Sequence, residues 1–256
     1  MRWTRFLHHG LPTLGRVEGE EVLVHEGDLF ADPRPTGERV PLTGLAWLPP
    51  CVPGQIVGLW NNFRAAAEKN GWAAPAEPLY FLKSPHCAIG QEAIIPAPPA
   101  EVGRVFYEGE LALVVGRRAR GLTPAEARGH VFGYACANDV TAFELLQRDP
   151  AFAQWTRAKS FPGFGAFGPW IDTGFDPAGA SLRTLVGGRE RQNYPFADMF
   201  FAPHELLSRL SHDMTLEPGD LILCGTSLGA LPMKPGTVVE VVIDGLGTLR
   251  NVYGAG

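Results

Sequence analysis

The chain has 256 residues, 45% of them hydrophobic, which is enough for one large domain, or one large and one small, with a well-buried core. Its formal net charge of -5 excludes the basic surface that a nucleic-acid backbone requires, so we expect no nucleic-acid partner. The chain has no long apolar run and its first residues have no apolar signal-peptide core, so we expect neither membrane insertion nor secretion.

Four cysteines, Cys51, Cys87, Cys136 and Cys224, are widely spaced and form no CxxC pair. Such spacing favours reduced thiols that serve as small core residues over a disulfide or zinc framework. We therefore expect a cytoplasmic protein.

Glycine and proline, with 31 and 23 residues, interrupt the chain too often for long helices to dominate. We expect many short strands in a mixed, β-rich (α+β) fold. The runs EEVLVHEG and GQIVGLW indicate a small N-terminal sheet, and FRAAAEKNGW (63–72) is typical of a helix. The Pro- and Ala-rich joint that follows predicts a boundary near residue 75, which divides the chain into domains 1–75 and 76–256.

The second part alternates strand-like runs with two helices. The helices are expected in TPAEARGH, whose Thr-Pro start is typical of a helix N-terminus, and in APHELLSRLSH, whose apolar residues have helical spacing. The expected strands lie in LYFLKS, FYEGELALVVG, HVFGYACANDVT, GPWIDTG, DLILCGTS and TVVEVVIDGLGTLRNV.

Two acids, Glu108 and Glu110, stand at the start of the apolar run in FYEGELALVVG. Residues two apart in a strand project to the same face, so the two carboxylates point together. Taken alone, this pattern is more often the solvated face of an edge strand. A third acid, Asp139, ends the run GYACAND, where a lone charge is costly unless it is paired or bound to a metal.

Three carboxylates at strand ends form a ligand set for a hard divalent cation, Mg²⁺, Mn²⁺ or Ca²⁺, and leave positions for a chelating substrate. Zinc is disfavoured because the seven histidines show no HExxH or comparable pairing.

Five motifs in order carry a resemblance to a known family. YEGELALVVGR, GYACANDVT, QWTRAKSF with FGPW, MTLEPGDLILCGTSLG and IDGLGTLRNV resemble the motif series of the fumarylacetoacetate hydrolase superfamily, over roughly residues 79–256. Within the superfamily, LWNNFRAAAEKNGW and LYFLKSPHCAIG are most similar to the isomerase/decarboxylases of homoprotocatechuate breakdown.

The resemblance implies a role for each matching position. Glu108, Glu110 and Asp139 would hold Mg²⁺ or Mn²⁺, and Lys159 in RAKSF would be the active-site lysine. Gly225 and Thr226 in CGTS would contact the substrate carboxylate, with Lys159 close by. The implied fold is a twisted, mixed β-roll with a small N-terminal β domain, and the implied assembly is a homodimer.

This chemistry suits a 2-oxo acid or its 2-hydroxy-diene tautomer, whose carboxylate and C2 oxygens are two neighbouring donors for a hard cation. A bound cation would stabilise the negative charge that develops on the C2 oxygen. Lys159 would add positive charge and relay a proton, since burial next to a cation lowers the pKa of a lysine. Without the resemblance, the alternative for Lys159 is a surface lysine. For Thr226 the sequence alone favours a turn residue that bonds its own backbone.

Three departures from the family pattern bear on the reaction. Hydrolases of the superfamily typically have a His and a Glu on the early helix, where this chain keeps Glu68 but has alanines at the His positions. Many members have Arg and Gln after the metal-binding Asp, where this chain has the apolar Phe143 and Leu146. An Asp that often follows the lysine is replaced by Pro162.

We therefore expect a metal-dependent isomerase, with decarboxylation left open, of 2-hydroxy-dienoic or 2-oxo-enoic dicarboxylic acids from aromatic-acid breakdown. Arg157 and Arg191 are candidates to bind a second substrate carboxylate. One alternative is a C–C bond hydrolase or an oxaloacetate- or acylpyruvate-type enzyme of the superfamily, which a His beside the metal, such as His86, would favour. The other is a non-catalytic, metal-stabilised binding protein.

Overall fold

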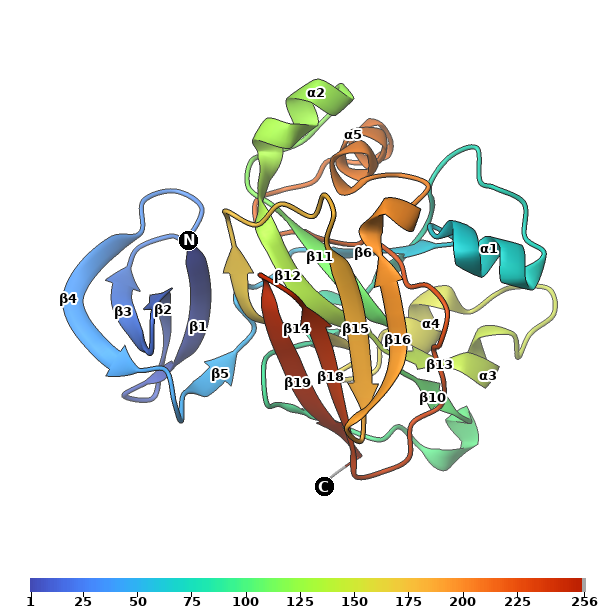
Figure 1. Ribbon diagram of the computed structural model, residues 1–256, viewed down its shortest axis with the longest axis horizontal. Helices are drawn as coiled ribbons and strands as arrows, with labels where there is room; N and C mark the ends of the chain where they lie inside the picture. The colour runs from blue at the N-terminus through green and yellow to red at the C-terminus, as the bar shows by residue number, and fades with distance from the viewer. Residues whose placement is uncertain (255–256) are drawn as a thin grey trace.

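The computed structural model describes residues 1–254 and shows a strand-rich protein in which a narrow N-terminal part lies beside a larger body (Figure 1). The β-rich (α+β) class expected from the glycine and proline content is confirmed. The N-terminal part contains the strands β1 (Arg2–His8), β2 (Leu11–Glu18), β3 (Glu21–Glu26), β4 (Arg34–Pro41) and β5 (Ala46–Leu48).

The central sheet of the body continues from these strands. Its hydrogen-bonded order is β4-β3-β2-β1-β14-β12-β11-β17-β6-β7, and the short β8 (Ala88–Ile89) also pairs with β14. The bounds of the body strands are β6 (Ile56–Trp60), β7 (Leu79–Lys83), β11 (Gly109–Val115), β12 (Val131–Asp139), β14 (Gly165–Asp172) and β17 (Leu221–Leu223).

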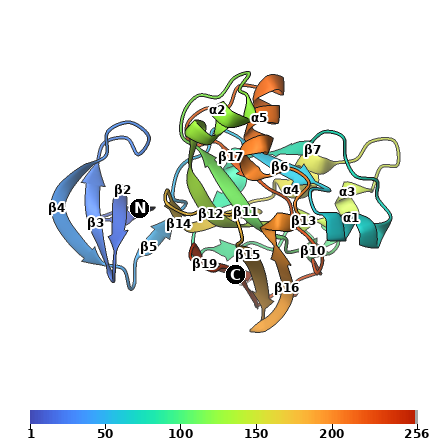
Figure 2. The same ribbon diagram turned by 45° about the horizontal axis from the view of Figure 1, so that its top comes forward.

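A second sheet covers one face of the first, as the turned view makes clear (Figure 2). Its order is β16-β15-β18-β19-β9, with β9 (Ile94–Ile95), β15 (Ser181–Val186), β16 (Arg189–Pro195), β18 (Thr237–Ile243) and β19 (Gly247–Tyr253). A two-stranded ladder joins β10 (Val105–Phe106) to β13 (Thr141–Ala142).

The helices are short. Three of them confirm the predicted segments: α1 (Arg64–Asn70), α2 (Pro124–Ala127) and α5 (Pro203–Asp213). In α2, Thr123 is the N-cap residue, as the Thr-Pro start predicts, and it also forms a capping box with Glu126. The others are α3 (Phe143–Leu146), α4 (Trp155–Lys159) and the 3-10 turns Pro85–Cys87, Ala100–Val102, Arg128–His130 and Phe196–Asp198.

Strand β11 runs through the middle of the core, and all seven of its residues are buried. Leu111, Leu113 and Val115 pack toward the second sheet and α5, whereas Ala112 and Val114 pack on the opposite side. A strand covered on both faces reads as a continuous apolar run, which accounts for the sequence ELALVV. The four cysteines are free and buried, as predicted.

The run GQIVGLW does form a strand, β6, but its partners differ from those expected. β6 pairs with β17 in parallel and with β7 in antiparallel orientation, so it belongs to the body and not with the N-terminal strands. Alternation of residue types predicts a strand but does not identify its neighbours. The division of the chain near residue 75 stays a prediction.

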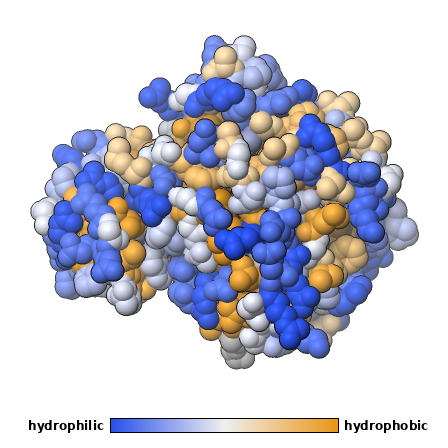
Figure 3. Space-filling view, viewed as in Figure 1, coloured by the Kyte–Doolittle hydropathy of each residue, from blue (hydrophilic) through white to orange (hydrophobic). Residues whose placement is uncertain are grey.

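Within residues 1–254, no helix has the length and apolarity needed to span a bilayer. On the face shown in Figure 3, hydrophilic residues cover most of the N-terminal part, at the left, and alternate with apolar residues over the body.

Candidate metal and substrate site

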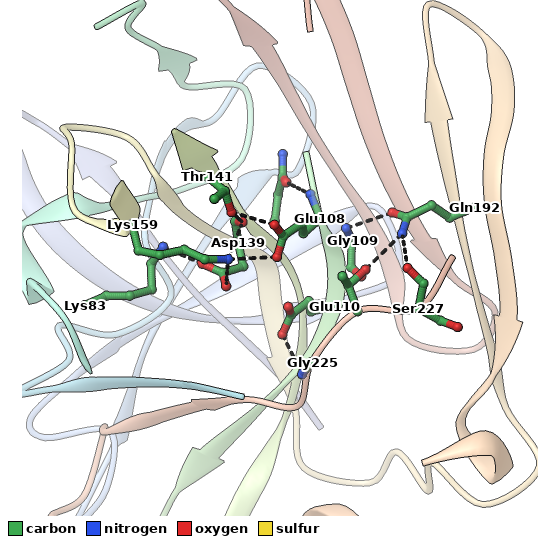
Figure 4. A network of polar contacts seen from close by, with 12 residues as sticks. Lys83, Glu108, Gly109, Glu110, Asp139, Thr141, Lys159, Gln192, Gly225 and Ser227 are labelled. Carbon is green, nitrogen blue, oxygen red and sulfur yellow. Dashed lines mark hydrogen bonds and ion pairs between the residues drawn. The ribbon is translucent and has the colours of Figure 1, made fainter. Parts of the chain in front are cut away.

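The three predicted carboxylates meet at one end of β11 and β12 (Figure 4). Glu108 directly precedes β11, Glu110 is its second residue, and Asp139 is the last residue of β12. One oxygen from each carboxylate lies within 4.8 Å of the others. Asp139 is fully buried and Glu110 is 1% exposed, so the cluster is not the solvated face of an edge strand.

Gly109, between the two glutamates, faces a crowded side of the strand. A Cβ atom there would lie 2.1 Å from Thr184 Oγ1, so no larger residue fits unless the Thr184 side chain moves. The Gly109 N–H donates to Gln192 Oε1 at 2.9 Å, and its carbonyl accepts from Thr226 Oγ1 at 3.0 Å and from the Tyr194 hydroxyl. These bonds fix the backbone that aims both glutamates at Asp139.

Two buried lysines complete the cluster. Lys159 Nζ donates to Glu108 Oε2 at 2.7 Å and to Asp139 Oδ2 at 2.5 Å, and Lys83 Nζ donates to Asp139 Oδ1. Their side chains are 3% and 0% exposed. Lys159 is therefore not a surface lysine.

The carboxylates change the pKa of Lys159 in the direction opposite to that expected from the sequence. Burial alone would lower the pKa of Lys159, but the charges of Asp139, Glu108 and Glu110 outweigh burial and raise it. In this arrangement Lys159 holds its proton and donates hydrogen bonds to Glu108 and Asp139.

The acids themselves differ. Burial acts to raise the pKa of Asp139, but Lys159 and Lys83 outweigh it and lower that pKa, so Asp139 stays ionised. Among the described residues, no lysine is hydrogen-bonded to Glu110. Burial and the charges of Asp139 and Glu108 raise the pKa of Glu110 well above 4.5. The positive charge of Lys159 and the N–H of Gly225, which donates to Glu110 Oε2 at 2.7 Å, offset this only in part.

This set of oxygens fits a hard divalent cation. All three acids are oxygen donors, they converge, and Glu110 is a buried carboxylate whose ionised form lacks a cationic partner. A divalent cation would supply that partner.

The predicted substrate residues lie next to the cluster. Thr226 lines the cavity. Its hydroxyl donates to the Gly109 carbonyl and accepts from Gln192 Nε2 at 2.9 Å, so its hydrogen-bond partners are residues of the site and not the backbone of its own turn. Gly225, at φ +92°, does not line the cavity among the described residues, and its N–H is used by Glu110.

A cavity of about 300 Å³ opens onto Glu108, Lys159 and Thr226. Most of its remaining wall is apolar and includes Leu59, Trp60, Trp72, Phe81, Phe143, Leu146 and Trp155. Within residues 1–254, no histidine lines it, and His86 and Glu68 are both exposed elsewhere.

Of the three positions after the metal-binding Asp and the lysine that depart from the family pattern, two line the cavity and one does not. Phe143, which is 41% exposed, and Leu146 line the cavity as apolar groups, and Phe143 packs on Phe106 at 4.8 Å. Pro162 is exposed and does not line it. The same holds for Arg157 and Arg191, so the structure does not bring either arginine to the cavity.

Three site residues escaped the sequence analysis. Lys83 lies in the quoted run LYFLKS, and its inward position, two residues after the buried Phe81, is the signal that could have found it. Thr141 Oγ1 donates to Glu108 Oε1 at 2.6 Å, and Gln192 joins Gly109 to Thr226. Gln192 lies in the polar hairpin RERQNYP, where nothing in the sequence indicates burial.

Comparison with known families yields two matches. Residues 55–253 match the model described as fumarylacetoacetate (FAA) hydrolase C-terminal, and residues 1–50 match the model described as Rv2993c-like, N-terminal. Among curated relatives, Protein Rv2993c of Mycobacterium tuberculosis is 38% identical over 87% of this chain and 83% of its own length. The 4-hydroxyphenylacetate degradation bifunctional isomerase/decarboxylase of Salmonella dublin is 36% identical over 77% of this chain and 46% of its own length.

Solved structures agree. The 2-hydroxyhepta-2,4-diene-1,7-dioate isomerase of Mycobacterium marinum superposes with a TM-score of 0.89 at 33% identity, over 99% of this chain and 98% of that one. A maleylpyruvate hydrolase from Sphingobium, in complex with manganese(II) and pyruvate, superposes over both full chains with a TM-score of 0.78 at 25% identity. These matches confirm the predicted fold, and the relatives include isomerases and decarboxylases.

Proposed function

Because the chain belongs to the fumarylacetoacetate hydrolase family, we propose that it is a divalent-metal-dependent isomerase of 2-hydroxy-dienoic and 2-oxo-enoic dicarboxylic acids in aromatic-acid breakdown. The proposed type is a 2-hydroxyhepta-2,4-diene-1,7-dioate isomerase, with decarboxylation as a second activity of the same site. The observation that carries the proposal is the convergence of Glu108, Glu110 and Asp139 beside Lys159, at the end of a largely apolar cavity that Glu108 and Lys159 line.

In this proposal the three acids hold Mg²⁺ or Mn²⁺. When bound, the cation supplies positive charge to the carboxylate and C2 oxygens of the substrate. A manganese(II) and pyruvate complex of a structural neighbour supports this choice of metal and ligand class.

The chain's own residues then perform the proton transfer. Lys159 would relay the proton: it would give its own proton to a carbon of the diene and regain one from the C2 hydroxyl, provided that the charge of a bound cation offsets the carboxylate charges that raise its pKa. Hydrogens and charge therefore balance over the isomerisation. The Thr226 hydroxyl would orient the substrate carboxylate by turning its hydrogen from the Gly109 carbonyl to the substrate. The apolar wall would limit access of water to the reacting carbons.

The lining also bears on hydrolysis. A hydrolase needs a base that activates water, and the cavity lining within residues 1–254 contains no histidine. Glu68, the remaining acid of the early helix, is exposed. Isomerisation needs no attacking water, so it is the better supported reaction.

We also propose a homodimer located in the cytoplasm. The dimer is supported by an exposed apolar face of β7, and the location by four free, buried thiols in the described chain.

The test is an ultraviolet assay on 2-hydroxyhepta-2,4-diene-1,7-dioate with protein stripped by a chelator and resupplied with Mg²⁺ or Mn²⁺. We expect metal-dependent loss of the diene absorbance, and in Glu110→Ala a rate lower by on the order of a hundredfold or more. Glu20→Gln, an exposed acid in the turn between β2 and β3, is the matched control and should react at the wild-type rate.

Cleavage of an acylpyruvate in place of the diene acid would favour the hydrolase. If no acid reacts with either metal while chelation lowers the melting temperature, the protein is a metal-stabilised binding protein.

A further inference from the structure

The cavity extends away from the carboxylate cluster along a continuous row of aromatic rings. Lys159 Nζ lies 5.0 Å from the ring centre of Phe81, which stacks on Trp155 with ring centres 5.0 Å apart. The ring centre of Trp60 lies 6.3 Å from that of Trp155 and 4.8 Å from that of Trp72. Trp72 stands two residues beyond α1, so the row joins the centre of the site to the C-terminal end of that helix.

One positive charge stands at this outer end. Lys69, in the last turn of α1, lines the cavity, is exposed, and forms no ion pair with a carboxylate in residues 1–254. The other lining cation, Lys159, is bound to Glu108 and Asp139. Glu108 is the only acid in the described lining, so the outer end of the cavity favours an anion.

Among the described residues that line the cavity, Lys69 is the cation available to bind an anion at the outer end. Phe143 and Leu146 bring no charge, and Arg157 and Arg191, the candidates from the sequence, do not line the cavity. A flat, conjugated chain suits the aromatic row, because aromatic surfaces stack on planar unsaturated groups.

We propose that Lys69 binds the second carboxylate of the substrate and thereby selects dicarboxylic over monocarboxylic dienoates, while the row from Phe81 to Trp72 packs against the conjugated chain between the two ends. This inference rests on the proposed function, because it assumes that the first carboxylate is held at the cluster of Glu108, Glu110 and Asp139. It makes Lys69 a specificity residue that touches the substrate far from the reacting atoms.

The test compares two substrates that differ only at the far end, 2-hydroxyhepta-2,4-diene-1,7-dioate and 2-hydroxyhepta-2,4-dienoate. Lys69→Met removes the charge but keeps a flexible apolar stem, and Lys69→Arg keeps the charge. We expect Lys69→Met to raise KM for the diacid about tenfold, with KM for the monoacid and both kcat values unchanged. Lys69→Arg should retain most of the preference, and high salt should weaken the preference of the wild type, because the ammonium group is exposed.

Lys234→Met, at an exposed lysine that does not line the cavity, is the matched control and should leave both KM values unchanged. Melting temperatures of all variants check that they fold. Quenching of the fluorescence of Trp60, Trp72 and Trp155 measures binding independently of turnover.

The proposal is overturned if Lys69→Met changes both KM values by the same factor or neither of them, or if the wild type prefers the monoacid. If the proposed function itself is wrong, the result differs: the metal-loaded wild type then isomerises neither acid.

Discussion

Five buried or half-buried ionisable side chains lie at the centre of the site, and their positive and negative charges do not cancel. Glu108, Glu110 and Asp139 contribute three negative charges when ionised, whereas Lys83 and Lys159 contribute two positive charges, which leaves one negative charge in excess. The excess falls on Glu110, whose hydrogen-bond donor is a neutral backbone amide. A buried carboxylate without a cation is costly to ionise, so Glu110 is the acid whose protonation responds to metal binding.

This imbalance predicts that metal binding releases a proton from Glu110. Burial and the neighbouring acids raise the pKa of Glu110 above its ordinary 4.5, so in the metal-free protein it stays protonated between 4.5 and the raised value. Its contribution to folding stability is complete below pH 4.5 and is lost as the pH rises through the raised pKa. The affinity for Mg²⁺ or Mn²⁺ should rise across the same window, because the cation binds the ionised form.

Calorimetric titration in buffers of different ionisation enthalpy measures the protons released. We expect close to one proton per metal ion below the raised pKa and none above it. Glu110→Gln, which cannot release this proton, should bind the metal weakly and with no such pH dependence. Equal proton release by the wild type and Glu110→Gln would contradict the assignment.

At the scale of elements, the site depends on contacts between strands that are distant in the hydrogen-bonded order. Lys83 ends β7 and Asp139 ends β12, yet three strands, β6, β17 and β11, lie between β7 and β12 in the sheet. The two side chains meet because the sheet curls back on itself: the chain after β7 continues through the turn Pro85–Cys87 into β8. There Ala88 pairs with Gly165 of β14, which is also the partner of Asp139.

The sequence predicts the features of the site that depend on local patterns, but not those that depend on how distant strands come together. The acids at the strand ends and the buried run of β11 follow from local patterns, since burial and alternation depend on neighbouring residues. The partners of β6, and the contact of Lys83 with Asp139, depend on how strands assemble over long separations, and a single sequence carries no signal for that. The same reason hides Gln192, which looks like a residue of an exposed hairpin.

Asn62, between β6 and α1, illustrates how elements are tied together around the site. Its buried amide donates to the carbonyls of Phe201 and Cys224 at 3.2 and 2.8 Å and accepts from the Phe201 N–H at 3.0 Å. Cys224 precedes Gly225, whose N–H donates to Glu110. One side chain thus joins the start of α1, the start of α5 and the turn that positions a predicted metal ligand.

We predict that Asn62→Ala lowers the free energy of unfolding by about 3 kcal/mol, because it leaves three buried backbone groups without partners. The affinity for the metal should also fall, since the turn that positions Glu110 loses its support. Urea denaturation measures the first effect and calorimetry the second. Asn193→Ala, which removes an exposed hydrogen bond in the β15–β16 hairpin, should cost less than about 1 kcal/mol, and a similar loss in both variants would refute the argument.

On the scale of the whole molecule, the two parts of the chain are joined by few contacts in the sheet. β1 pairs with β14 through two residue pairs, Arg2 with Asp172 and Trp3 with Ile171, and the family models change between residues 50 and 55. At the opposite end of the sheet, β7 is the last strand of the hydrogen-bonded order.

The outer face of β7 is apolar but exposed. Phe81 and Lys83 point inward to the site, whereas Tyr80 and Leu82, on the alternate face, are 39% and 43% exposed. Leu79, at the start of the strand, is 37% exposed. Adjacent exposed apolar residues on an end strand are typical of a contact with another chain, and the partner that fits the proposed homodimer is a second copy.

We therefore predict that the protein elutes with a mass of twice 27.7 kDa in size-exclusion chromatography with light scattering, and that Leu82→Glu shifts it toward 27.7 kDa. The substitution places a charge that is costly to desolvate in the contact without touching the core, so the melting temperature of the monomer should stay measurable. Leu11→Glu, at a leucine in the N-terminal part that is 68% exposed, should remain dimeric. A wild type that is monomeric at every concentration would contradict the dimer, and a dimer that tolerates Leu82→Glu would place its interface away from β7. Because β7 also supplies Phe81 and Lys83 to the site, loss of the dimer should lower the metal affinity as well as the mass, which links assembly to the site.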